Sequence, residues 1–179
     1  MSSSNLQRFK IRPIHPESLA EIELIATRMR ETLIEVLGEE VGGNMYTLEW
    51  LKDRVMFHLT PERSVGEVFV AEDGSGAIVG HTIVRVEHEE AGATVGLFST
   101  TYVAKEFRSA GVASVLLNHG ERWMVDHGMS EAVTYTDTAN TKLKNLYVKH
   151  GYHWIEAGNN FIRLSKSIGS SAPSANDGG

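Results

Sequence analysis

The stretch that decides the fold is Val103-Ala104-Lys105-Glu106-Phe107-Arg108-Ser109-Ala110-Gly111-Val112-Ala113. Residues 93–103 before it are rich in Thr, Val, Phe and Tyr, which is typical of a strand. Apolar residues then follow helical spacing from Val112 towards Gly128. A short loop of small residues at a helix start exposes backbone N–H groups beside the positive end of the helix dipole, which suits a phosphate. For the loop taken alone, a structural explanation is favoured, in which Gly111 only lets the helix and the strand approach each other closely.

A second segment changes this balance: Asn140-Thr141-Lys142-Leu143-Lys144-Asn145-Leu146-Tyr147-Val148-Lys149-His150-Gly151-Tyr152. Residues 108–113 resemble the R/Q-x-x-G-x-G/A motif of the GNAT family of N-acetyltransferases. The second segment is similar to that family's N-x-x-x-x-x-L-Y-x-x-x-G-F/Y motif. The two motifs occur in the family's order and on the expected elements, and together they cover residues 101–152.

The resemblance implies a role for each matching residue. Backbone groups of one strand edge would contact the pantetheine arm of coenzyme A, namely Thr101, Tyr102 and Val103. The loop would bind the pyrophosphate through Arg108, Ser109, Ala110, Gly111, Val112 and Ala113. A free strand edge can pair with an amide-containing arm as it would with another strand, so the physics agrees.

Two further residues acquire roles from the resemblance, and each has a plain structural alternative. Asn140 would reach the cofactor from the next helix, but Asn at a helix start is also a common N-cap. Tyr147 would protonate the departing thiolate, which a tyrosine hydroxyl can do. It also continues the apolar stripe of Leu143, so a core position is the alternative.

The general base is where the sequence departs from the family's pattern. Tyr135 occupies one position where some members carry Glu, and Leu97 and Ser99 occupy the region where others do. Candidates acting through a water chain remain, although each is also explained as a solvated residue at a strand end: Asp137, Glu87, His88 and His81.

The resemblance therefore implies transfer of an acetyl group from acetyl-coenzyme A to a primary amine, with direct attack by the neutral amine. The acidic balance favours a small-molecule acceptor. An alternative, motivated by the missing carboxylates, is a catalytically weak acyl-coenzyme A-binding or regulatory module on the same fold. The chain has no Cys, so a cysteine acyl-enzyme is excluded.

Charged and metal-binding patterns add little. Glu31, Glu35 and Glu39 repeat at four-residue spacing, which is typical of a solvated helix face. Because the family's first two helices and their loop, here residues 38–47, cover the acceptor, an acidic rim attracting a cationic amine is a second interpretation. Eight His are present, but no H-E-x-x-H motif, so we expect solvated or capping His and no metal.

The remaining pattern predicts an α/β (α+β) fold in the order β-α-α-β-β-β-α-β-α-β-β. The helices are expected over residues 17–38, 48–59, 112–128 and 143–150. With the family resemblance, this order implies a mixed, mostly antiparallel sheet of about six to seven strands flanked by about four helices.

Composition limits the class of protein. The 179 residues carry a net charge of −6 and no basic run, which disfavours nucleic acid as a partner. No stretch is apolar enough for a signal peptide or a membrane span, so we expect a cytoplasmic protein with no membrane partner. One N-acetyltransferase domain, residues 1–168, is predicted, with a flexible tail at 169–179. The sequence leaves the oligomeric state, including a homodimer, open.

Overall fold

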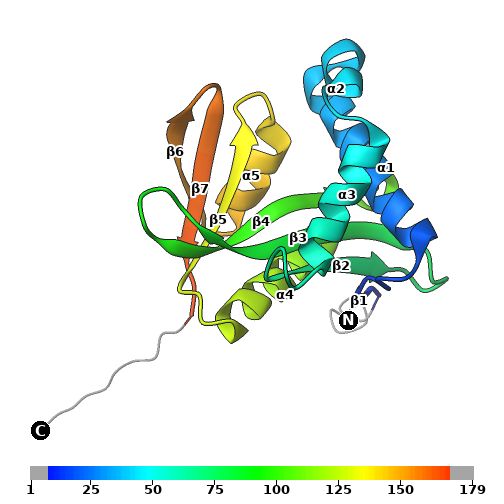
Figure 1. The fold of residues 1–179 in the computed structure, drawn as a ribbon, viewed down its shortest axis with the longest axis horizontal. Helices are drawn as coiled ribbons and strands as arrows, with labels where there is room; N and C mark the ends of the chain where they lie inside the picture. The colour runs from blue at the N-terminus through cyan, green and yellow to red at the C-terminus, as the bar shows by residue number, and fades with distance from the viewer. Residues whose placement is uncertain (1–7, 170–179) are drawn as a thin grey trace, which may run out of the picture.

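A seven-stranded sheet forms the centre of the computed structural model, which describes residues 8–169 (Figure 1). The strands are β1 (Lys10–Pro13), β2 (Gly66–Glu72), β3 (Ile78–His88), β4 (Thr94–Val103), β5 (Glu131–Asp137), β6 (His153–Gly158) and β7 (Phe161–Ser167). The helices are α1 (Leu19–Leu37), α2 (Glu39–Met45), α3 (Leu48–Leu59), the 3-10 turn η2 (Lys105–Phe107), α4 (Val112–Asp126) and α5 (Thr141–Lys149). Residues 170–179 of the predicted tail lie outside the described residues.

The strands lie in the order β1-β2-β3-β4-β5-β7-β6. Only β4 and β5 pair in parallel, and every other neighbouring pair is antiparallel. The prediction of a mixed, mostly antiparallel sheet is confirmed. The parallel pair follows from the chain path, because α4 crosses between the end of β4 and the start of β5.

Helices cover both faces of the sheet. On one face α1 and α3 enclose a cluster of Ile and Val side chains, whose buried members are Ile14, Ile22, Ile25, Val55, Val68, Val70 and Ile83. On the other face α4 packs through Leu117 and Met124, and α5 contributes Tyr147 to the same cluster. None of the helices within residues 8–169 is long and apolar enough to cross a membrane.

The first helical region differs from the prediction. Gly38 ends α1 as expected, with φ of 88° and its N–H donating to Ile34 O at 2.8 Å. The resemblance placed a loop between the first two helices at residues 38–47, but the structure has α2 there. A Cβ on Gly42 would lie 2.2 Å from the carbonyl oxygen of Leu33, so the glycine permits close packing of α2 on α1. The described residues therefore contain five α-helices rather than about four.

Candidate functional site

The candidate site begins where β4 and β5 separate. The two strands pair only between residues 96–98 and 132–134. Thr134 Oγ1 donates a hydrogen bond to the carbonyl oxygen of Phe98 at 2.9 Å, at the last paired position. Beyond it β4 continues along β3 to Val103, while β5 continues along β7. The edge of β4 that faced β5 therefore has no strand partner beyond Phe98, as the sequence analysis expected for residues 101–103.

A β-bulge lies at the same point. Ile83 of β3 is paired with Thr100, whereas the next residue, Val84, is paired with Phe98. Ser99 is therefore an extra residue in β4. A bulge bends its strand and increases the local twist, which helps to turn β4 away from β5.

Tyr147 closes the inner end of this gap from α5. Its side chain is 1% exposed, and its hydroxyl lies 3.1 Å from Thr101 Oγ1. The ring packs edge-on against Phe98 and Tyr152. Burial raises the pKa of the Tyr147 hydroxyl above its ordinary value, so the group stays protonated at neutral pH. Tyr147 therefore occupies a core position and also directs its hydroxyl towards β4.

The loop before α4 presents free backbone donors. Gly111 is the N-cap with φ of 87°, and no side chain caps the helix. Within residues 8–169 the N–H groups of Val112, Ala113 and Ser114 have no protein acceptor, and the first helical bond is from Val115 N to Gly111 O. These donors and the helix dipole suit an anion. The positive φ of Ser109, 79°, adds to the unusual conformation of the loop.

A carboxylate connects this loop with α5. Arg108 Nη1 lies 2.9 Å from Glu35 Oε1, and Lys142 Nζ lies 3.3 Å from the same oxygen. The hydrogen bond from Arg108 lowers the pKa of Glu35 below its usual range. Arg108 Nε also donates to Val103 O at 2.8 Å. Glu35 is therefore not simply a solvated residue, and α1 ends before Glu39, so the predicted row of three acidic residues does not share one helix.

Asn140 takes the structural role that the sequence left as an alternative. Its Oδ1 accepts a hydrogen bond from Leu143 N at 3.2 Å and caps α5. The predicted contact of Asn140 with the cofactor stays a prediction.

With this geometry in place, comparison with known proteins identifies the family. The model of the acetyltransferase (GNAT) family matches residues 25–152. The chain belongs to the acetyltransferase (GNAT) family. It is accordingly an acyl-coenzyme A N-acetyltransferase by class. No curated protein is similar enough to the chain to count as a match.

Solved structures of GNAT proteins share the fold. The PaiA N-acetyltransferase of Thermoplasma acidophilum, solved with coenzyme A, is 16% identical with a TM-score of 0.69, over 89% of this chain and 99% of that chain. Ard1 of Thermoplasma volcanium is 18% identical with a TM-score of 0.67, over 91% and 99%. A chain of the NatC complex bound to Gag peptide and coenzyme A is 15% identical with a TM-score of 0.69, over 91% and 100%.

Among the four candidates for the GNAT general base, two lie far from the gap. Glu87 and His88 are paired with Val95 and Thr94 at the other end of β4. At about 3.3 Å per residue, Thr94 lies about 20 Å along the strand from Thr100. Glu87 forms an ion pair with Arg85, and His88 bonds Thr94.

The other two candidates lie nearer. Asp137 ends β5, and its Oδ1 accepts from Ala139 N at 2.8 Å. His81 is fully buried and paired with Tyr102, so the prediction of a solvated His is wrong there. His58, near the end of α3, is also buried rather than solvated, and its Nδ1 bonds the carbonyl oxygen of Arg54 at 2.9 Å. The described residues contain no cluster of three metal-ligating side chains.

Sequence reasoning also missed Arg28 on α1, whose guanidinium carbon lies 5.2 Å from the centroid of the Tyr102 ring. The signal was available, because Arg28 follows the buried Ile25 by three residues and so lies beside the apolar stripe of the helix.

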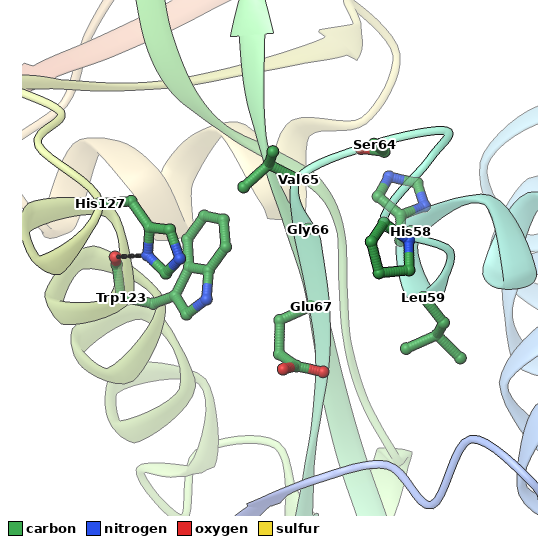
Figure 2. Close-up of a pocket in the computed structure, with 9 residues that line it drawn as sticks. His58, Leu59, Ser64, Val65, Gly66, Glu67, Trp123 and His127 are labelled. Carbon is green, nitrogen blue, oxygen red and sulfur yellow. Dashed lines mark hydrogen bonds between the residues drawn. The ribbon is translucent and has the colours of Figure 1, made fainter.

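A cavity of about 330 Å³ lies elsewhere on the molecule (Figure 2). It is lined by the start of β2 and the ends of α3 and α4. Glu67, His58 and His127 are its ionisable groups. All three already have protein partners: Glu67 accepts from Val68 N, His127 bonds the carbonyl of Trp123, and both ring nitrogens of His58 are bonded. This cavity is therefore no part of the candidate site.

Proposed function

We propose that this GNAT protein transfers the acetyl group of acetyl-coenzyme A to a primary amine of a small molecule. The observation that carries the proposal is the gap between β4 and β5, with the Tyr147 hydroxyl at its inner end and the uncapped start of α4 beyond its outer end. The free edge of β4 therefore runs between a group of N–H donors that can bind phosphate and the Tyr147 hydroxyl, which can donate a proton.

The binding of acetyl-coenzyme A follows from three features. The free N–H groups of residues 112–114 would hold the pyrophosphate, and Gly111 would let it approach closely because it has no Cβ. The edge of β4 at Thr101, Tyr102 and Val103 would pair with the amides of the pantetheine arm. The coenzyme A bound to the Thermoplasma acidophilum relative supports this part of the proposal.

In the proposed reaction the neutral amine attacks the thioester carbonyl carbon. A C–N bond forms and the C–S bond breaks, while a backbone N–H near residues 101–103 stabilises the oxyanion. Tyr147 donates its proton to the departing sulfur, and the attacking nitrogen loses a proton to water. A buried hydroxyl with a raised pKa suits this role, because it stays protonated until a strong base forms beside it.

A turnover screen tests the function. Polyamines, amino acids, aminoglycosides and peptides with free amino termini are offered with acetyl-coenzyme A, and thiol release is measured against a control without acceptor. Steady turnover with a small amine supports the proposal. Turnover with peptides alone, a class of molecule that is bound in the NatC structure, contradicts the small-molecule part. Tight cofactor binding without turnover across the whole panel favours the binding module instead.

A further inference from the structure

Arg28, a half-buried arginine with one buried guanidinium nitrogen and no acidic partner within the described residues, lies beside the gap. Arg28 Nη1 has no exposed surface and no hydrogen-bond partner within residues 8–169. Two other part-buried arginines are paired with carboxylates: Arg12 lies between Glu21 and Glu72, and Arg163 pairs with Glu89. Leaving a buried N–H group without an acceptor is costly, so the unpaired Nη1 of Arg28 indicates that its acceptor is absent from the protein itself.

A second unpartnered nitrogen lies next to the first. His81 is fully buried, its Nε2 lies 3.1 Å from Thr100 Oγ1, and its Nδ1 has no partner among the described residues. The His81 ring stacks on Tyr102 with centroids 5.6 Å apart and planes 15° apart. Arg28 contacts the same Tyr102 ring from α1. Two orphaned nitrogens, from α1 and from β3, therefore flank one aromatic side chain.

Burial, together with a smaller effect of the positive charge of Arg28, lowers the pKa of His81 to about 3. The imidazole is neutral at physiological pH. When the Thr100 hydroxyl donates to Nε2, Nδ1 carries the hydrogen and becomes a donor. The pair then presents one positive charge and one neutral N–H donor.

The position of the pair matches the approach of an acceptor. Tyr102 and Thr100 point to the α1 face of the sheet, whereas Thr101 between them contacts Tyr147 on the α5 face. Tyr147 fills the α5 side of the gap, so an amine reaches the gap from the α1 side. Arg28 and His81 lie on that side, beside the β4 residues that would hold the thioester.

We propose that Arg28 and His81 bind a carboxylate of the acceptor, so that the substrate is an amine that also carries a carboxylate. This inference rests on the proposed function and names its substrate class. A single guanidinium with a neutral imidazole matches the single negative charge of a carboxylate, and the planar fork of Arg suits its two oxygens. The interpretation of the acidic residues as a rim that attracts a cationic amine loses support, because Glu35 is already paired with Arg108 and Lys142.

The first test compares amino acids with their amides: glycine with glycinamide, leucine with leucinamide and lysine with lysinamide. Each pair keeps the amine and removes the carboxylate charge. The wild type is expected to show a kcat/KM about 10-fold or more higher for the acids. Arg28→Gln is expected to remove this preference by lowering kcat/KM for the acids alone, and Arg28→Lys is expected to restore part of it.

The control variant is Arg122→Gln, because Arg122 is exposed on α4 and its loss changes the net charge equally. It should keep the preference for acids. Affinity for acetyl-coenzyme A should be the same in all variants. The melting temperature of Arg28→Gln should stay close to that of the wild type, because Arg28 is half-buried and forms no ion pair within the described residues. A fall in kcat/KM for acids and amides alike, or equal activity of wild type on both, overturns the inference and leaves acetyl transfer intact.

A binding measurement separates the inference from the proposed function. Calorimetric titration of the same amino acids into the protein saturated with coenzyme A needs no turnover. Binding of glycine, leucine or lysine that Arg28→Gln weakens by about 10-fold or more supports the carboxylate site even if no amine is acetylated. Equal binding by wild type and Arg28→Gln, or no binding by either, overturns it.

Discussion

Thr101 Oγ1 on β4 lies 3.1 Å from the hydroxyl of Tyr147 on α5 and connects the edge of the gap with the buried phenol. The contact joins the strand edge proposed to bind the pantetheine arm with the second of the two family motifs. It also gives the Tyr147 hydroxyl a partner before any substrate binds. A core tyrosine and a poised proton donor would share this geometry, so kinetics must separate them.

Tyr147→Phe removes one hydroxyl and keeps the ring that packs on Phe98. Loss of a positioned acid should lower the chemical step by about 100-fold or more, with little change in cofactor affinity. Single-turnover measurement with an identified amine is required, because product release can limit steady-state turnover.

The matched control is Tyr152→Phe. Tyr152 is also buried, but its hydroxyl donates to Glu121 at 2.7 Å. This variant should retain the wild-type chemical step. A wild-type single-turnover rate in Tyr147→Phe would remove that residue from the mechanism and leave it as part of the core.

Gly111→Val tests the phosphate loop. The φ of Gly111 is +87°, and a Cβ there meets no protein atom within 4 Å. Valine would therefore strain the backbone and occupy the space through which the pyrophosphate approaches. Calorimetric titration with acetyl-coenzyme A should show that affinity is lost while the fold persists.

Gly128→Val separates strain from ligand contact. Gly128 has a φ of +82° and open space around its Cβ position, but it follows the far end of α4. Both variants should lose stability, whereas only Gly111→Val should lose affinity. Unchanged affinity in folded Gly111→Val would disprove the assignment of the loop.

The sequence was sufficient to predict those local structures of the site that depend on residues close together in the chain. The loop at Gly111 combines a left-handed residue with a helix start, and the Leu146-Tyr147 pair sits one turn before the end of a helix. Both properties can be read within about a dozen residues. The order of strands and helices follows from the same local periodicities.

Contacts between distant segments could not be read in this way. Gly42 lies in the segment that the resemblance placed in a loop, and glycine disfavours helices, whereas its close packing on Leu33 of α1 is a contact that local sequence does not show. Arg28 and His81 are 53 positions apart, and their proximity depends on how α1 crosses the sheet. The dense β-branched run of β3 did hint at a strand buried on both faces, which would have predicted a buried His81.

Glu35→Gln tests the carboxylate between the loop and α5. Its removal frees Arg108 and Lys142 and deletes a negative charge near the proposed phosphate site. Affinity for acetyl-coenzyme A should rise by about 3-fold to 5-fold at low salt, and the gain should shrink as ionic strength increases. Titrations at two salt concentrations measure both effects.

Glu23→Gln is the control for net charge, since Glu23 is exposed on the same helix. It should leave the affinity unchanged. Weaker binding by Glu35→Gln would mean instead that Glu35 holds Arg108 in its binding position.

His58 makes stability depend on pH. Its Nδ1 bonds the carbonyl of Arg54 at 2.9 Å and its Nε2 lies 2.9 Å from Arg85 Nη1, an arrangement that requires the neutral ring. Burial lowers the pKa of His58 from 6.5 to about 4, and the charge of Arg85 acts in the same direction. Above pH 6.5 the ring is neutral in the folded and unfolded states alike. Below it the unfolded chain binds a proton that the folded protein does not, so stability falls as the pH drops towards 4.

Between pH 7.5 and pH 5.0 this group should cost about 2 kcal/mol of unfolding free energy. Urea unfolding at the two pH values measures the loss in the wild type, to which His81 contributes in the same direction because its pKa is also lowered. His58→Gln should lose about 2 kcal/mol less than the wild type over this interval. His153→Gln, at an exposed position on β6, should behave as the wild type. If His58→Gln shows the full wild-type loss, protonation of His58 is not coupled to unfolding and the ring tolerates its charge within the fold.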